Sequence, residues 1–283
     1  MVWNVLKEIF SWQSKMTLFM IFGGLFIILV VLLSSLFSPF LAPYSPVSLD
    51  FKPLEPPNLE NLFGTDLLGR DVFSRVIYGG RVSILIATLS ICMSLCISVP
   101  LAGLFTYIGG RLDTLMMLLM DSLWVFPIYL LALVMTLLFG TSVVTMSMTI
   151  GIAFIPSVYR MVRSLSLTIK EQTFIEAERS LGASTGYIVY KHILPYTLPT
   201  LIVITSLNLA QAIIIVSSLN FLGFGIPPPT PDWGTDLCIG NRVWLGGSWW
   251  CTFFPGLMIF LTVAGFNLFG EGLDALLEKR KKF

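Results

Sequence analysis

Long stretches without charged side chains constrain the fold of this chain more than any other feature. Residues 16–49, for example, contain no Asp, Glu, Lys or Arg. A helix rises about 1.5 Å per residue, so roughly 20 mostly apolar residues cross the hydrocarbon core of a bilayer. The segments that approach or exceed this length are 17–37, 82–110, 114–138, 143–159, 197–224 and 253–270. We therefore predict an all-α integral membrane protein with about six transmembrane helices.

The charged and metal-binding residue types exclude several classes of protein. Only 12% of the 283 residues are charged, whereas soluble domains contain about a quarter. The formal net charge of +1 lacks the basic excess of a nucleic-acid-binding protein, so no nucleic-acid partner is expected. The single histidine, His192, has no histidine or cysteine nearby in the sequence, so no metal site and no bound cofactor are expected. The sequence leaves undecided whether Cys238 and Cys251 form a disulfide, because both lie in or near the same loop.

The distribution of Lys and Arg predicts how the helices are oriented. Six spans place both termini on one side of the membrane, and Lys and Arg collect on the cytoplasmic side. With the termini inside, 12 of the 17 Lys and Arg residues are cytoplasmic. We therefore predict that both termini are cytoplasmic. Residues 3–12 have the spacing of a helix that lies on the membrane surface, and a frayed tail is the alternative.

A polar segment at residues 160–196 separates the fourth span from the fifth. Thr173 and Glu176 form the pattern of a capping box, in which each side chain satisfies a free backbone N–H at a helix start. A short helix is therefore expected to begin near Phe174, and Gly182 suits the left-handed residue just past its end. A second amphipathic stretch follows and ends at the next proline. We predict a helix, a turn and a second helix in the cytoplasm.

This polar segment resembles the EAA loop of binding-protein-dependent ABC importers. The resemblance is carried by the Glu176–Ala177 pair, by Gly182 and by the Leu194–Pro195 pair. The segment departs from the family pattern at Glu178 and at His192. In that family the loop is a coupling helix that docks on a cytoplasmic ATPase. The resemblance implies the same role here for Thr173, Glu176, Ala177, Gly182, Leu194 and Pro195.

Two further stretches are similar to one branch of the same family. The first spans residues 63–75 and includes Phe63, Gly64, Thr65, Asp66, Gly69, Arg70, Asp71, Ser74 and Arg75, and the second spans residues 221–234. Both resemble the C-type permease of dipeptide, oligopeptide and nickel importers. This resemblance implies the type I ABC importer permease fold in a bacterial inner membrane. Residues 1–62 would hold the amphipathic segment, the first transmembrane helix and an outer loop, and residues 63–283 would form the permease core.

The resemblance also implies partners for this chain. The sequence has no Gly-x-x-x-x-Gly-Lys-Ser/Thr phosphate loop, so it is predicted to be no enzyme, with ATP and Mg²⁺ bound by two separate ATP-binding subunits. A second, B-type permease would complete the translocation path, an extracytoplasmic solute-binding protein would deliver cargo, and membrane lipid would surround the helices. Dipeptides or oligopeptides are the predicted cargo. Nickel or a metal chelate is the alternative, and a self-contained channel or secondary transporter is a third interpretation.

Polar side chains inside the spans are candidates for the translocation path. Ionisable groups are costly in lipid and tend to face a protein interior or a watery path. Asp121 lies in the third predicted span, and Asn208 and Gln211 share one face of the fifth. These three are the candidate pathway residues. Pairing with a neighbouring subunit is the alternative for Asp121, and bonds between helices are the alternative for the two amides.

Charged residues before the second span are candidates for a contact on the outer side. Arg70, Asp71 and Arg75 would supply charge for docking of the solute-binding protein. The alternative is that they are salt-linked residues at the start of a helix. The sequence leaves both interpretations open.

Overall fold

The computed structural model describes residues 12–281, so residues 3–11 of the predicted surface segment lie outside the described part. The long helices are α2 (Trp12–Leu36), α4 (Val72–Ile108), α5 (Gly110–Trp124), α6 (Ile128–Phe139), α7 (Val143–Lys170), α10 (Leu194–Phe221) and α12 (Trp250–Lys281). The shorter elements are α3 (Ser38–Leu41), α8 (Thr173–Ser180), α9 (Thr185–Ile188), the π-helical turn η1 (Val189–Ile193), α11 (Trp233–Asn241) and the 3₁₀ turn η2 (Trp244–Gly246). Within residues 12–281 the only β-type pairing is one isolated bridge. The all-α prediction is confirmed.

The membrane-spanning helices agree with the predicted number and differ in one place. Five helices are long and apolar enough to cross a bilayer, and α5 with α6 makes a sixth if this bent pair is counted as one span. The prediction of one continuous helix at 114–138 is wrong, because the chain bends by 84° between α5 and α6. Pro127 stands at the break. Proline lacks a backbone N–H and disfavours the helical conformation of the residue before it, so the helix ends there.

Two helices extend beyond the membrane spans predicted for them, for one physical reason. Helix α4 begins at Val72, before the predicted span that starts at residue 82, and α7 continues past its predicted span to Lys170. Loss of hydropathy marks where a helix leaves the hydrocarbon, whereas backbone capping decides where the helix itself ends. At the start of α4, Asp71 is the N-cap, and its side chain accepts a hydrogen bond from the Ser74 backbone N–H at 2.8 Å.

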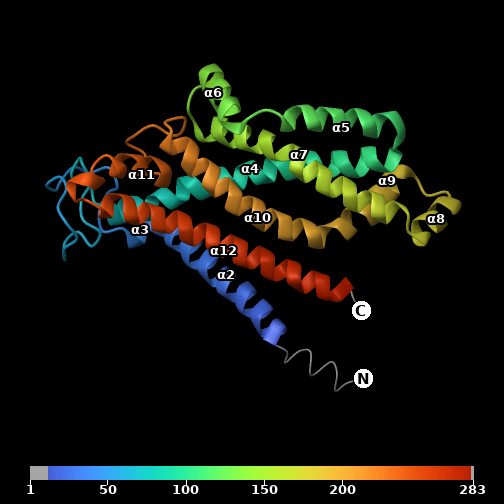
Figure 1. Ribbon diagram of the computed structural model, residues 1–283, viewed down its shortest axis with the longest axis horizontal. Helices are drawn as coiled ribbons and strands as arrows, with labels where there is room; N and C mark the ends of the chain where they lie inside the picture. Colours follow the sequence, from blue (N-terminus) through green and yellow to red (C-terminus); the bar gives the residue numbers. More distant parts are fainter. Residues whose placement is uncertain (1–11, 282–283) are drawn as a thin grey trace.

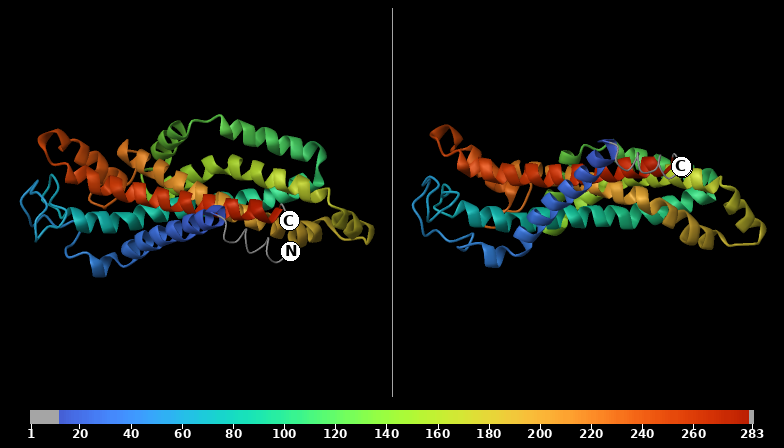
Figure 2. Two further views of the ribbon diagram at one scale, coloured as in Figure 1. Left: turned by 60° about the horizontal axis from the view of Figure 1, so that its bottom comes forward. Right: turned by 90° about the horizontal axis from the view of Figure 1, so that it is seen from below.

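The long helices other than α6 run roughly along a common direction, so the molecule has two distinct ends (Figure 1). The loop before α4 gathers with α11 at one end, called the α11 end here, and α8 and α9 form the opposite, α8 end. Figure 2 shows the same division from two other sides. Helices α4, α7 and α10 form the core, where Ile86, Ile150 and Ile213 are at most 1% exposed. Helix α2 begins, and α12 ends, toward the α8 end.

Helix α2 packs closely against α12 through glycines (Figure 1). A Cβ atom on Gly24 would lie 2.5 Å from the backbone N of Phe269 and 2.7 Å from the carbonyl O of Gly265. Small residues allow two membrane helices to approach until their backbones touch, and van der Waals packing then holds the helices together. Gly23, the preceding residue, has nothing within 4 Å of a Cβ position.

Replacing Gly24 by valine should separate α2 from α12. A β-branched side chain would collide with backbone atoms that cannot rotate away, so we expect a loss of about 1–3 kcal/mol in stability. Thermal unfolding of the purified protein in detergent measures this. Gly23→Val is the matched control and should unfold close to the wild type. Equal losses in the two variants would contradict the close packing of α2 on α12.

Candidate functional site

A cavity of about 360 Å³ opens beside the bend between α5 and α6. Its polar lining comes from Ser157 on α7 and from Asn208 and Gln211 on α10. The remaining lining residues are apolar or aromatic: Leu123, Trp124, Phe126, Ile128, Leu131, Ile152, Ala153, Phe154 and Ile215. The Asn208 side-chain amide nitrogen has no hydrogen-bond partner within residues 12–281. Two of the three predicted pathway residues therefore lie in one cavity, at a volume typical of small-molecule sites.

Asp121, the third predicted pathway residue, lies beside this cavity and not in its lining. Its Oδ1 accepts a hydrogen bond from Nη2 of Arg160 at 2.8 Å, and the two side chains are 56% and 37% exposed. The Arg160 guanidinium also lies 4.9 Å from the centre of the Trp124 ring. Asp121 is thus paired within its own chain. Arg160 was not among the candidate residues predicted from the sequence, although its position three residues after Ser157 places both on one helix face.

A second ion pair joins the same two helices nearer the α8 end. Arg163 donates from Nε and Nη2 to the two carboxylate oxygens of Asp113, at 2.8 Å and 2.6 Å. This two-bond geometry is the strong form of an arginine–carboxylate contact. The pair ties α5 to α7, so the wall of the cavity is held by charge as well as by packing.

The segment between α7 and α10 contains the turn that the sequence predicted. Gly182 has a φ of +83°. The backbone N–H of Gly182 bonds to the carbonyl of Arg179 at 2.9 Å, and that of Ala183 bonds to Glu178 at 3.0 Å. These two bonds form a Schellman motif, which satisfies the free carbonyls at the end of α8. A left-handed residue is strained unless it is glycine, so Gly182 fits this position.

The predicted capping box at the start of α8 is wrong. The helix begins at Thr173 itself, the N-cap position falls on Gln172, and no side chain caps the helix. Only two residues separate α8 from α7, and the Gln172 N–H already bonds back to the carbonyl of Ile169. The short connection shifts the N-cap by one residue. Glu176 and Ala177 are both exposed, as a docking surface requires, and the coupling role assigned to this segment stays a prediction.

The predicted helix end at Leu194 and Pro195 is also wrong. Helix α9, the π-helical turn η1 and α10 form one continuous helix over residues 185–221. Pro195 lies in the first turn of α10, directly after η1. Its ring has no N–H to donate, and the wider π turn accommodates the change of hydrogen-bond register at that point. Leu194 is half-buried, with its Cδ2 2.9 Å from a Cβ position on Gly103 of α4.

The buried side of this segment fastens α8 to the end of α4. Ile175, Ile188 and Ile193 are fully buried and cluster with Tyr107. Arg179 donates from Nε to the Tyr107 hydroxyl at 2.8 Å, and its guanidinium lies 4.9 Å from the ring centre.

Two further contacts lie in and beside this segment. Lys170 donates to the carbonyl of Thr106 at 3.3 Å. His192 Nε2 lies 3.3 Å from a Glu178 carboxylate oxygen without hydrogen-bond geometry. Helix α8 is therefore a fixed extension of the bundle, with one exposed side.

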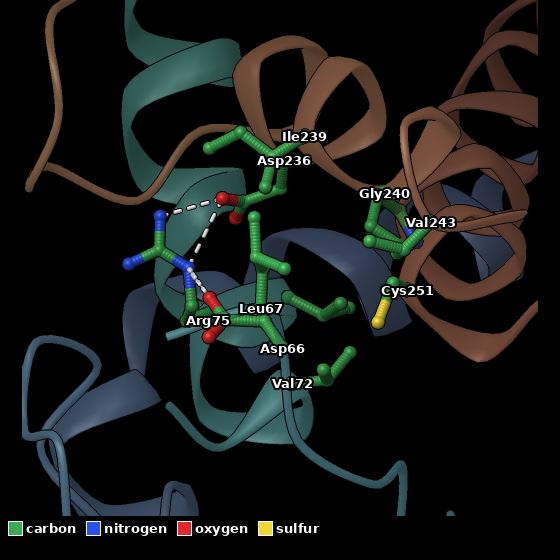
Figure 3. A pocket seen from close by; sticks show the side chains of 11 residues that line it. Asp66, Leu67, Val72, Arg75, Asp236, Ile239, Gly240, Val243 and Cys251 are labelled. Carbon is green, nitrogen blue, oxygen red and sulfur yellow. Dashed lines mark hydrogen bonds and ion pairs between the residues drawn. The ribbon is translucent and has the colours of Figure 1, made fainter. Parts of the chain in front are cut away.

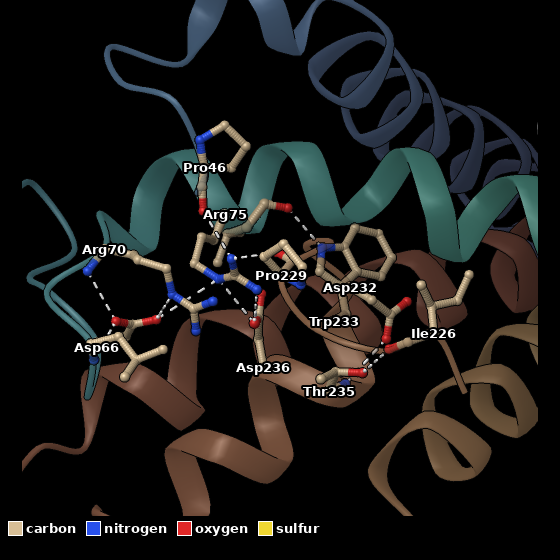
Figure 4. Close-up of polar contacts among 12 residues, drawn as sticks. Pro46, Asp66, Arg70, Arg75, Ile226, Pro229, Asp232, Trp233, Thr235 and Asp236 are labelled. Atoms are coloured by element: carbon tan, nitrogen blue, oxygen red, sulfur yellow. Dashed lines mark hydrogen bonds and ion pairs between the residues drawn. The ribbon is translucent and has the colours of Figure 1, made fainter. Parts of the chain in front are cut away.

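The charged residues at the α11 end are buried in a network (Figure 4). Arg70 and Arg75 are each 2% exposed, and Asp71 is fully buried. Arg70 donates from Nε to Asp66 at 2.6 Å, and Arg75 donates from Nε to Asp236 of α11 at 3.0 Å. The network thus joins the start of α4 to α11, as salt-linked residues at a helix start would. Docking of a binding protein through these residues stays a prediction.

Burial changes the protonation of this network. Desolvation raises the pKa of Asp236 to about 6. The neighbouring Arg75 opposes this rise, and the charge of Asp232 adds to it. The pKa of Asp232 is raised by burial as well. Figure 3 shows Arg75 joined by dashed lines to both Asp236 and Asp66 beside a small cavity, which Cys251 also lines. Cys238 and Cys251 are both free, so the disulfide left open by the sequence is absent.

Comparison with known proteins identifies the family. Residues 94–283 match the family described as the binding-protein-dependent transport system inner membrane component. This match covers well over half of the chain. The chain belongs to this family. It is a multi-pass inner-membrane permease of ABC importers, which confirms the resemblance drawn from the EAA loop.

Curated relatives of this permease cover nearly its whole length. It is 36% identical over 255 residues to the probable D,D-dipeptide transport system permease protein DdpC of Escherichia coli (strain K12), covering 90% of this chain and 85% of the relative. It is 37% identical over 269 residues to the glutathione transport system permease protein GsiD of Escherichia coli O6:K15:H31 (strain 536 / UPEC), covering 92% and 86%.

A solved structure supports the type I importer fold of this permease. The methionine ABC transporter MetNI in an inward-facing conformation superposes with a TM-score of 0.55. The match covers 73% of this chain and 96% of that chain at 21% identity, so it bears on the fold alone. Within residues 12–281 of this permease, no group of three or more His, Cys, Asp or Glu residues could hold a metal ion.

Replacing Arg75 by methionine should destabilise the α11 end of this permease. The change leaves Asp236 buried without its cation, and breaking a buried pair in this way costs about 3–5 kcal/mol. Because the folded-state pKa of Asp236 lies above its ordinary value of 3.8, the fold accommodates the protonated form better, and stability is lost as the pH rises through the folded pKa. The loss should therefore be smaller at pH 5 than at pH 8.

Thermal unfolding in detergent at both pH values checks this expectation. Arg81→Met is the matched control, because Arg81 is an exposed arginine on the same helix. It should change the unfolding temperature little. A loss for Arg75→Met that is the same at pH 5 and pH 8 would contradict the assigned role of Asp236.

Proposed function

We propose that this permease forms one half of the translocation path of an ATP-driven importer for dipeptides or oligopeptides. The observation that carries the proposal is the pairing of two features on the same helices. Helices α7 and α10 both line the cavity that contains Asn208 and Gln211, and both lead directly into the segment that holds α8. A movement of α8 is therefore passed to the cavity wall without an intervening flexible linker.

The other subunits of the importer follow from this arrangement. The cavity is open on one side of a single chain, so a second permease of the B type would close the path. The chain has no phosphate-binding loop, so two ATP-binding subunits with ATP and Mg²⁺ would dock on α8, and this chain would carry no catalytic residue. An extracytoplasmic solute-binding protein would deliver the cargo at the α11 end.

The proposed orientation places the α8 end in the cytoplasm. Helix α2 begins and α12 ends toward the same end as α8 (Figure 1). Twelve of the 17 Lys and Arg residues lie on that side in the six-span arrangement, in agreement with the positive-inside rule. Both termini would therefore be cytoplasmic. Cysteine labelling from outside the cell at residues placed in α8 would test the orientation, and efficient labelling there would overturn it.

Peptides are the proposed cargo because two relatives of 36% and 37% identity are named for D,D-dipeptide and glutathione transport. The cavity wall also combines amide side chains with aromatic surface, which suits the amide groups and side chains of a short peptide. Nickel or a metal chelate is the competing cargo. Uptake of labelled dipeptides, longer peptides and nickel should be compared in cells with and without this subunit. Loss of nickel uptake alone, or of none, would overturn the peptide proposal.

Replacing Gly182 by valine should weaken coupling to the ATPase. The residue has a φ of +83°, which a β-branched side chain adopts only with strain, although a Cβ there would meet no atom within 4 Å. The end of α8 should therefore rearrange while the buried core stays intact. We expect less ATP-binding subunit to co-purify and peptide uptake to fall several-fold.

Gly186→Val is the matched control for this coupling prediction. Gly186 also has open space around a Cβ position, but its φ lies in the ordinary range. This variant should retain both co-purification and uptake. If Gly182→Val and Gly186→Val behaved alike, the Schellman turn would have no special part in coupling.

A further inference from the structure

The Asp121–Arg160 pair lies beside the cavity, on the side toward the α8 end. Trp124 and Ser157 line the cavity, and Asp121 and Arg160 each lie one turn from them toward the α8 end. The two residues meet across α5 and α7 through the 2.8 Å hydrogen bond. In the proposed orientation this is the cytoplasmic side of the cavity. Cargo that leaves the cavity for the cytoplasm would pass this pair.

The exposure of the pair shows that it does not face lipid. The Asp121 and Arg160 side chains are 56% and 37% exposed, yet both belong to helices that cross the membrane. A charge exposed to hydrocarbon is costly, so such groups face a watery path or another protein subunit. Arg160 lies three residues after Ser157 on α7, so it shares a helix face with a residue that lines the cavity.

Arg160 has hydrogen-bonding capacity that its partner does not use. A guanidinium has five N–H donors, and Asp121 receives a single bond from Nη2. Nε of Arg160 is buried and also lacks a partner within the described residues, so the capacity open to a ligand is on the Nη groups. Exposed ion pairs contribute little to stability and exchange easily. The Trp124 ring, 4.9 Å away, would hold the guanidinium in place by a cation–π contact when Asp121 is displaced.

We propose that Arg160 binds the terminal carboxylate of a peptide as it leaves the cavity, taking that carboxylate in exchange for Asp121. The proposal rests on the proposed function as a peptide importer and adds a specificity contact to it. While no cargo is present, the Asp121 carboxylate takes the place of the peptide carboxylate and keeps the Arg160 guanidinium paired. The amides of Asn208 and Gln211, which line the cavity, are uncharged and suit the peptide bonds. The site therefore selects cargo with a free carboxylate.

The test compares two forms of one peptide in cells that carry the complete importer. One form has a free terminal carboxylate, and the other has a terminal amide that the wild-type importer transports. Both are supplied at concentrations that saturate the solute-binding protein, so that the transport rate per complex reports the membrane step. Arg160→Gln should lower the rate for the free acid about tenfold or more, as expected for loss of a charge-assisted hydrogen bond. It should change the rate for the amide little.

Three further variants separate a cargo contact from a structural role. Arg160→Lys keeps the charge and should restore part of the preference for the free acid. Asp121→Asn removes the substitute carboxylate and should keep the preference. Arg163→Gln breaks the neighbouring pair with Asp113, a turn further from the cavity, and should affect acid and amide equally.

Several outcomes would overturn the proposal. Equal falls for acid and amide in Arg160→Gln would assign the residue a structural role. Loss of the second permease from the purified Arg160→Gln complex would assign it to the interface between subunits. If the wild-type importer moved neither form of any peptide, the proposed peptide function itself would fail, and that result differs from both of the others.

Discussion

The requirement that charges within the membrane be paired determines how the two helices next to the cavity are held. Asp113 bonds to Arg163 through two hydrogen bonds, and Asp121 bonds to Arg160 through one. Both pairs join α5 to α7, and α5 is the helix that precedes the 84° bend. The two-bond Asp113–Arg163 pair therefore holds α5 against α7, and the bend at Pro127 turns α6 away. The space beside this bend is the cavity that Asn208 and Gln211 line.

Different interactions stabilise the two ends of the bundle. At the α8 end, fully buried isoleucines and the aromatic ring of Tyr107 hold the coupling segment against α4, with Arg179 on the ring. At the α11 end, buried ion pairs join the start of α4 to α11. Helix α4 contributes to both ends, so it connects the surface proposed for the ATPase with the surface proposed for the binding protein. A rigid connection of this kind is what alternating access by movement of whole helices requires.

Much of the candidate site was predictable from spacing along a single helix. Asn208 and Gln211 are three residues apart, so they share a face wherever that helix packs. Gly182 was predictable because a helix that ends in a polar loop favours glycine in a left-handed conformation. Arg160 was missed because its importance depends on Asp121 and Trp124, which lie on another helix. The capping box failed because the two-residue link from α7 moved the start of α8.

The sequence by itself determined the class of the protein, the number of membrane spans and the family, because hydropathy and local motifs act within one segment of chain. Only the tertiary structure decided that Asp121 pairs with Arg160 and that Arg70, Asp71 and Arg75 are buried rather than exposed. These features depend on contacts between residues far apart in sequence, such as Arg75 with Asp236. The identity of a charged residue does not say whether its side chain faces water or a buried partner. Packing between helices decides which of these two environments it has.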